Sequence, residues 1–206
     1  MKEVVCFFLK GREFGVDVSQ MKTIAHEVKL QPREGLPDFV KGIVDVHGEQ
    51  IPMVDLEQLL TIPDGNQRNE RRNVVFNSKC GSFAIESDGI SEIVTVEDRD
   101  VQGVPGFFNQ DQTNYADCVI RKKNNALVVV MNPDRMMTEE QFAALKKVID
   151  EIEEERREAE RKRLEEERRR KEEEKRQREE ELEKMKQDGQ GEEPADSASG
   201  EEKDDE

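Results

Sequence analysis

Short runs of apolar residues separated by turn-forming residues fill the first 135 positions of the chain. The two longest runs, 4–9 and 126–131, have the length of strands rather than of long helices. In the segment 21–26, one set of residues alternates with another at the period of two that a half-buried strand shows. The first set is Met21, Thr23 and Ala25, and the second is Lys22, Ile24 and His26. The pattern predicts ten strands, at 4–9, 13–18, 21–26, 42–47, 50–54, 73–76, 82–86, 90–96, 118–122 and 126–131.

Turn residues join these strands. Gly48-Glu49 is expected to close one hairpin, because glycine can supply the positive φ that such a turn needs. Asn124-Asn125 joins the last two strands, and asparagine tolerates left-handed geometry. Polar loops are expected at 63–72 and 103–115, and the first of them divides the strands into two clusters. Two clusters of short strands are typical of small barrels or sandwiches.

The period changes after residue 137. Thr138 and Gln141 have the spacing of a capping box, with Thr at the N-cap and Gln at N3. The apolar residues that follow recur at helical spacing and form one stripe: they are Phe142, Leu145, Val148, Ile149 and Ile152. The stripe predicts a helix over 138–152 that packs on the strands.

From Glu153 the apolar stripe ends while helix-forming residues continue. Ile152 and Ala159 are seven apart, but Glu166 comes next, so the seam of an obligate coiled coil fails. Glutamates precede basic residues at i,i+4, the favoured polarity, in eight pairs: Glu153–Arg157, Glu158–Lys162, Glu165–Arg169, Glu166–Arg170, Glu167–Lys171, Glu172–Arg176, Glu174–Arg178 and Glu180–Lys184. Two interpretations of this segment stay open: a semi-rigid spacer, and a partly frayed solvated helix without a function. Whether the helix associates with a second copy is also open.

Composition limits the classes of protein. The formal net charge is −16. The segment 151–206 holds 15 Lys or Arg and 25 Asp or Glu, so its net charge is −10. No apolar run approaches the 18 residues of a membrane span, and no cleavage motif follows the N-terminus. The acidic chain shows no basic patch, so nucleic acid is a poor candidate partner. Three cysteines without CxxC spacing are expected to be reduced thiols in the cytoplasm.

Catalytic constellations are not evident. His26 and His47 lie on different predicted strands, without further metal ligands at zinc spacing, so we expect no metal and no other cofactor. Phosphate-binding glycine loops and hydrolase motifs are missing. Asp17, Asp45 and Asp55 are explained by strand exits and a helix cap at Asp55. The sequence therefore predicts a binding module and not an enzyme, with grooves, sheet edges and apolar patches as its surfaces.

Ordered motifs in the strand-rich region resemble the CheW-type chemotaxis coupling proteins. They are FGVDV from Phe14, MKTI from Met21, the block LPDFVKGIVDVHGEQIPMVDL from Leu36, and SDGISEI from Ser87. The block, with the pattern PxFVKGIVxVxGxxIPxVDL, is the most specific of these. The resemblance covers about residues 3–150. It implies two SH3-like, five-stranded β-barrel subdomains packed side by side, and a non-enzymatic adaptor.

The resemblance also implies partners and a site. One surface would bind the regulatory domain of a CheA-type histidine kinase, and a groove between the subdomains would take the cytoplasmic tip of a chemoreceptor. The protein would then lie in the cytoplasm at receptor arrays, meeting the membrane only through receptors. The implied partner-binding residues are Met21, Thr23, Ile24, Gly42, Val44, Val46 and His47. Alternatively, a CheW-like scaffold recruits or spaces a different partner through its charged helix.

Two positions depart from the family pattern. The family usually has glutamate where Thr23 stands and arginine where His47 stands. A hydroxyl and an imidazole here replace a potential ion pair, which removes long-range charge complementarity. Partner contact would then be retained through apolar groups, weakened or redirected, and compensating drift at a tolerant site is equally open.

The expected organisation joins these elements. A CheW-like domain spans 1–137, with subdomains at about 10–65 and 70–137 and the first strand a candidate for sharing between them. A packing helix follows at 138–152, then a charged solvated helix at 153–188. The segment 189–206 is acidic and lacks core-forming residues, so we expect it to be disordered.

Overall fold

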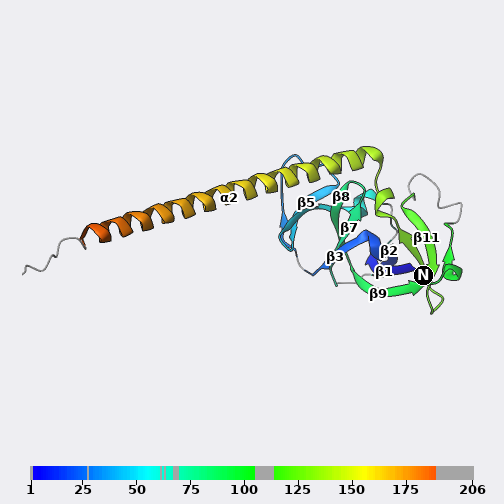
Figure 1. Ribbon diagram of the computed structural model, residues 1–206. Helices are drawn as coiled ribbons and strands as arrows, with labels where there is room; N and C mark the ends of the chain where they lie inside the picture. Colours follow the sequence, from blue (N-terminus) through cyan, green and yellow to red (C-terminus); the bar gives the residue numbers. More distant parts are fainter. Residues whose placement is uncertain are drawn as a thin grey trace, which may run out of the picture. The chain divides into compact units, whose positions relative to one another are not determined.

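The computed structural model describes residues 2–26, 28–60, 62, 64–66, 70–104 and 114–188 (Figure 1). The chain divides into two compact units, Met1–Glu155 and Arg156–Glu206, which are described separately below. Most of the predicted loop 103–115, part of the loop 63–72 and the whole acidic segment 189–206 lie outside the described residues.

The first unit contains two mixed sheets of six strands each. The first sheet has the order β3-β7-β8-β6-β5-β4. Its strands are β3 (Met21–Ala25), β4 (Leu30–Gln31), β5 (Val40–Val46), β6 (Glu49–Val54), β7 (Arg72–Ser78) and β8 (Gly81–Ser87). The second sheet has the order β10-β11-β12-β2-β1-β9. Its strands are β1 (Lys2–Leu9), β2 (Arg12–Asp17), β9 (Gly89–Val96), β10 (Val101–Gln102), β11 (Ala116–Arg121) and β12 (Leu127–Met131).

The two sheets share one topology. Strands β3 to β8 of the first sheet correspond in order to β9, β10, β11, β12, β1 and β2 of the second. Each sheet has one parallel pair at the equivalent place, β6 with β8 and β12 with β2. Each also has a register shift at its edge pair, between Met21 and Thr23 where β3 meets β7, and between Val5 and Phe7 where β1 meets β9. The fold is therefore an internal repeat whose second copy uses the N-terminal hairpin.

The two sheets distribute the strands differently from the expected subdomains at 10–65 and 70–137. The hairpin β1–β2 pairs entirely within the second sheet, and the hairpin β7–β8 lies in the first. Each hairpin follows from a local turn, but the parallel pairings join strands far apart in the chain, and no local pattern encodes them. All ten predicted strands are present, and the two-residue strands β4 and β10 raise each sheet from five strands to six.

The main core joins both sheets. Phe7 of β1 and Phe76 of β7 approach with ring centroids 6.0 Å apart, and Phe76 lies 5.5 Å from Phe83 of β8. All three side chains are fully buried. Tilted aromatic pairs of this kind stabilise a core beyond the area they bury. The two sheets therefore share one hydrophobic interior, and each also has a smaller cluster of its own.

Helix α2 (Glu139–Asp188) begins with the predicted capping box. The Thr138 N–H donates to Gln141 Oε1 at 2.9 Å, and the Gln141 N–H donates to Thr138 Oγ1 at 3.2 Å. The predicted apolar stripe is buried along the first four turns. Leu145 enters the main core, while Val148 and Ile152 pack against Ile43 of β5. This first part of α2 therefore packs on the strands through its apolar stripe.

Two further contacts attach this part of α2 to the segment after β4 and to the first sheet. Arg33 forms ion pairs with Glu151 at 3.3 Å and Glu155 at 2.8 Å. At the turn between β7 and β8, a Cβ added to Gly81 would lie only 3.1 Å from the side chain of Ile149. A residue without a Cβ therefore lets the helix approach the sheet closely.

The rest of α2 is solvated, as predicted. All side chains from Glu153 to Glu181 are exposed. The polarity of its ion pairs differs in part from the prediction. Glu167 pairs with Lys171 as expected, with an Nζ–Oε1 distance of 2.8 Å. Four other pairs run from a basic residue to a glutamate at i+4, namely Arg168–Glu172, Arg170–Glu174, Lys175–Glu179 and Arg176–Glu180.

Candidate functional site

The predicted site residues lie on β3, on β5 and in the turn between β5 and β6. In the order of the first sheet, β3 and β5 are far apart. An ion pair nevertheless bridges the two regions, because Lys22 Nζ of β3 lies 2.6 Å from Glu49 Oε2 at the start of β6. Lys22 also donates to Ser82 Oγ of β8 at 3.3 Å. We call β3 together with the β5–β6 turn the Thr23–His47 surface.

On β3, the three nominated residues are all partly buried. Met21 and Ile24 pack against the main core while keeping part of their surface accessible. Thr23 lies between them at the register shift, where an extra residue of β3 enters the ladder with β7. Register shifts of this kind re-aim side chains at sheet edges. β3 is an edge strand of the first sheet, and these three residues keep part of their surface accessible.

His47 lies exposed at the turn between β5 and β6. His47 and Gly48 both have positive φ, 56° and 83°. They are therefore the two central residues of the turn, one position earlier than the predicted pair Gly48-Glu49. The Gly48 N–H donates to Asp45 Oδ1 at 2.9 Å, which fixes the turn. The imidazole is thereby presented to solvent by a backbone conformation that histidine adopts more readily than most residues.

Gly42, Val44 and Val46 of β5 are buried and offer little surface. Val44 is 0% exposed and Val46 5%, and both pack inside the first sheet with Met53. A Cβ on Gly42 would lie 2.6 Å from the Gln31 carbonyl oxygen, so this glycine allows β4 to approach β5. These three residues therefore serve the packing of the first sheet.

A wide depression of about 1010 Å³ lies beside this region. Its lining combines apolar, basic, acidic and neutral polar side chains, namely His26, Val28, Leu30, Lys41, Met53, Arg71, Arg72, Asn73 and Glu86. Arg71 pairs with Glu86 at 3.1 Å, and Lys41 pairs with Asp55 at 3.4 Å. The sequence did not reveal this depression, because its residues come from strands whose order was unknown.

The second sheet has an equivalent surface that the sequence did not reveal either. Counting from the shared register, Glu92 of β9 corresponds to Thr23, and Lys122 corresponds to Val46. Lys122 Nζ lies 2.5 Å from Glu92 Oε1 and 2.9 Å from Glu13 Oε1. Ile93 beside them is 66% exposed, in a depression of about 460 Å³. We call this the Glu92–Lys122 surface.

The Lys122 ammonium is nearly buried, with 7% of its side chain exposed. Burial acts to lower the pKa of Lys122, but its hydrogen bonds with Glu92 and Glu13 outweigh burial and raise the pKa above its ordinary value. Lys122 is therefore charged at neutral pH and ties β9 to the β11–β12 hairpin and to β2.

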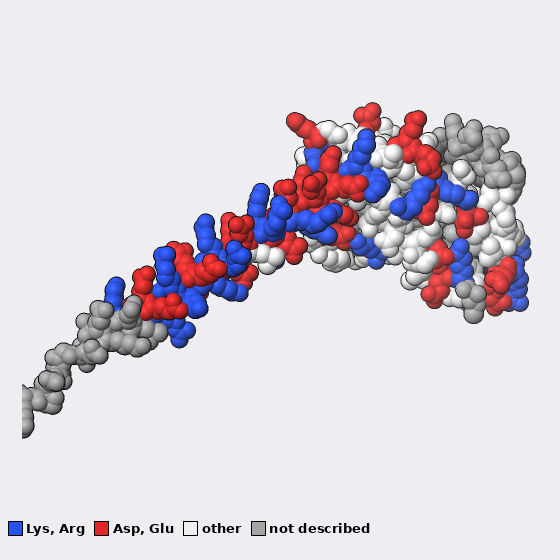
Figure 2. All heavy atoms as spheres, turned by 45° about the horizontal axis from the view of Figure 1, so that its top comes forward, with Lys and Arg blue, Asp and Glu red and all other residues white. Residues whose placement is uncertain are grey.

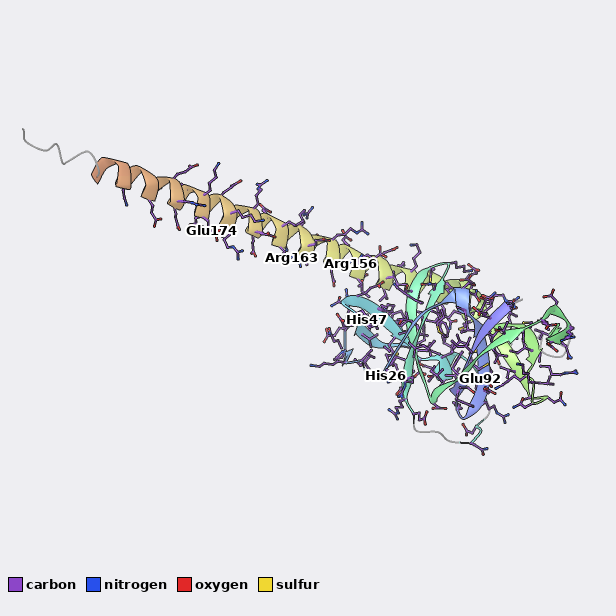
Figure 3. The ribbon with its side chains drawn as sticks, turned by 60° about the horizontal axis from the view of Figure 1, so that its bottom comes forward. His26, His47, Glu92, Arg156, Arg163 and Glu174 are labelled. Atoms are coloured by element: carbon purple, nitrogen blue, oxygen red, sulfur yellow. The ribbon has the colours of Figure 1, made fainter. Side chains whose placement is uncertain are left out.

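Reactive side chains do not converge in the described part of the chain. Figure 3 shows His26 and His47 at separate places, and Glu92 away from both. Burial, followed by the nearby Glu13 carboxylate, raises the pKa of the Cys6 thiol to about 11. A thiol with this pKa is a poor nucleophile at neutral pH. Among the described residues, no group of three or more His, Cys, Asp or Glu side chains could hold a metal ion.

Within the described ranges, no helix combines the length and the apolar character needed to cross a bilayer.

Known proteins with similar sequences are chemotaxis proteins. The chain is 19% identical to the chemotaxis protein CheW of Bacillus subtilis over 129 residues, which cover 63% of this chain and 83% of that protein. It is 24% identical to the chemotaxis protein CheW of Rhizobium meliloti over 143 residues, which cover 69% of this chain and 92% of that protein.

A solved structure shows the same fold. The scaffolding protein TtCheW from Thermoanaerobacter tengcongensis superposes with a TM-score of 0.57 at 17% sequence identity, covering 66% of this chain and 91% of that one. The model of the CheW-like domain family matches residues 3–141, which include both sheets and the start of α2. The chain therefore belongs to the CheW-like domain family and is a chemotaxis scaffold of the adaptor type, not an enzyme.

Proposed function

We propose that this chain couples a chemoreceptor to a CheA-type histidine kinase in the cytoplasm, at receptor arrays beside the membrane. Coupling requires one molecule to hold two partners at once, so that the state of one can bias the other. The observation that supports this role is the internal repeat. It places two equivalent surfaces, Thr23–His47 and Glu92–Lys122, on one folded unit.

The two surfaces differ in chemistry, which suits two different partners. The Glu92–Lys122 surface has a closed ion pair and an exposed isoleucine. At the equivalent positions the Thr23–His47 surface has a hydroxyl and a buried valine, with His47 as the exposed group nearby. Complementary charge governs association rate and partner choice more than affinity. The Thr23–His47 surface therefore relies on half-buried apolar groups such as Met21 and Ile24.

Binding measurements with fragments test this function. The full chain and a variant that ends at Glu155 are titrated with the cytoplasmic tip of a receptor and with the regulatory domain of the kinase. Ending at Glu155 keeps Ile152 in the core and keeps the Arg33 ion pairs, so the folded unit stays intact. We expect both variants to bind both fragments with equal affinity. A chain that binds neither fragment would contradict the proposal.

A second candidate function follows from the solvated part of α2. In this alternative the CheW-like unit recruits or spaces a different partner through the charged helix. The observation in its favour is the exposure of every side chain from Glu153 to Glu181. The same titrations separate the two functions, because only the alternative requires a partner that binds the full chain and not the variant ending at Glu155.

A further inference from the structure

The charged helix and the segment after it differ sharply in charge. Residues 156–188 contain 14 Lys or Arg and 13 Asp or Glu, a net charge of +1. Residues 189–206 contain one lysine and eight acidic residues, a net charge of −7. The helix is thus nearly neutral overall although most of its residues are charged. Its charges are balanced along its length, while the acidic charge is concentrated beyond it.

The charges of the helix repeat every seven residues. Glutamates occupy 165–167, 172–174 and 179–181, and basic residues fill 168–171 and three of the four positions in 175–178. Seven residues make almost two helical turns, so each block of three or four like charges covers about one turn. A residue of one block therefore has a residue of the opposite block at i+3 or i+4. The two signs consequently alternate around the whole helix, and Figure 2 shows Lys and Arg intermingled with Asp and Glu along it.

Ion pairs connect successive blocks. Lys171 pairs with Glu167 at 2.8 Å, and its hydrogen bond lowers the pKa of the Glu167 carboxyl. Arg168 and Arg170 pair forward with Glu172 and Glu174 at 3.8 and 3.7 Å. The next block continues in the same way, with Arg176 and Glu180 3.6 Å apart. Such a ladder supports a helix that has no tertiary contacts.

An apolar seam for a partner helix is missing over the described side chains. Ala159 and Leu164 are the apolar residues between Glu153 and Glu181, and Leu164 is 56% exposed. They are five residues apart, about 140° around the helix, so they do not share a face. A coiled coil needs apolar residues at two positions of every heptad. In this helix, charged residues occupy most of the positions where a coiled coil would need apolar ones.

We infer that residues 156–188 form a monomeric, self-supporting helix that serves as a stiff spacer between the CheW-like unit and the acidic segment 189–206. At 1.5 Å per residue, its 33 residues have a length of about 50 Å. A flexible linker of the same length would have an end-to-end distance of about 30 Å with a broad spread. The spacer thus adds a function to the adaptor, because the length of the helix sets the distance between the CheW-like unit and the start of the acidic segment. The inference does not depend on which partners the two surfaces bind.

Distance measurement in the full chain tests the spacer. Spin labels are attached through Ala159→Cys and Gln187→Cys, since the three native cysteines are buried. Double electron–electron resonance should give a narrow distribution near 42 Å for a helix, as 28 residues rise about 1.5 Å each. Deleting 168–174 removes one repeat, and the distance should fall to about 32 Å. A flexible chain would instead give a broad distribution near 29 Å that the deletion shortens by only about 4 Å, and that result would overturn the inference.

A block exchange provides the matched control, because it keeps composition and net charge while placing like charges at i,i+4. Its substitutions are Glu167→Arg, Arg169→Glu, Arg170→Glu and Glu172→Arg, which place like charges at every i,i+4 pair from 165/169 to 172/176. We expect this variant to lose the narrow distribution, and an unchanged distribution would show that the ladder does not support the helix. Sedimentation velocity completes the test: the full chain should sediment as a monomer, and a concentration-dependent dimer would contradict a single-helix spacer.

Discussion

At the scale of single residues, His47 is the sharpest departure from the family pattern. It is exposed, its φ of 56° already lies in the left-handed region, and its neighbour Gly48 supplies the next turn residue. Replacing it by arginine adds charge at this exposed position and loses only the modest preference of histidine for a positive φ. We expect His47→Arg to tighten binding of the receptor tip by up to about fivefold, the effect of an exposed ion pair of about 0.2–1 kcal/mol, mainly through faster association. The melting temperature should change little.

Calorimetric titration and thermal unfolding measure the two effects. Gln102→Arg is the matched control, because it adds the same charge at an exposed residue of the edge strand β10. Unaltered receptor affinity together with a large loss of stability would show that His47 has a structural role.

Lys122 is the residue whose removal should destabilise the second sheet most specifically. In Lys122→Met the long apolar stem is kept, but Glu13 and Glu92 lose the ammonium between them. Removing one partner of a buried pair leaves an uncompensated charge. Because Glu92 is half exposed, we expect a loss of about 2 kcal/mol, below the range for a fully buried pair. Lys123→Met, at the exposed neighbour, should cost almost nothing.

The pH dependence of stability gives a second signature of Lys122. The folded-state pKa is raised, so this stabilisation is fully present below the unfolded pKa of about 10.4 and is lost as the pH rises through the folded value. Urea unfolding between pH 8 and pH 11 should show the wild type approaching the Lys122→Met variant at the alkaline end. A constant difference between them over this range would contradict the ion-pair explanation.

At the scale of elements, α2 offers the same substitution in two environments. Leu145 is 0% exposed in the main core, whereas Leu164 is 56% exposed on the solvated part. Leu145→Ala should lower the free energy of unfolding of the CheW-like unit by about 2–5 kcal/mol, the usual cost of a cavity. Leu164→Ala should leave it unchanged within about 0.5 kcal/mol. Equal effects would mean that the helix does not change role near Glu153.

Local signals predicted the elements well. The capping box at Thr138 and the apolar stripe of α2 act within one helix, and the Asp55 cap likewise lies within a single helical turn. Strands β4 and β10 have two residues each, too few for a period of two to be recognised. The interleaved sheets also escaped prediction, because the pairing of β12 with β2 depends on contacts between the two ends of the domain.

The candidate site was predicted only in part. The resemblance nominated segments on β3 and β5, which remain a prediction, and the Lys22–Glu49 ion pair brings β3 and the start of β6 together. It could not separate exposed residues from buried ones, since Val44 and Val46 alternate with exposed neighbours and either face could have been the core. The Glu92–Lys122 surface required the register of both sheets, which the sequence alone does not contain.

At the scale of the whole molecule, the chain combines a folded adaptor unit with a helix of a different physical kind. The first unit is held by a core that both sheets share, which keeps its two equivalent surfaces in a fixed relation. The charged part of α2 has no core and relies on ion pairs in solvent. Salt should therefore weaken the helix while leaving the adaptor unit unaffected, because exposed pairs are screened and buried apolar contacts are not.

The most direct measurement of the central claim is the formation of a ternary complex. The full chain is mixed with a receptor tip fragment and the regulatory domain of a CheA-type kinase, and the masses of the complexes are determined by sedimentation. Two surfaces on one unit predict a complex of all three components, with each partner binding as well in the presence of the other as alone. Competition between the two fragments for a single surface would contradict the account.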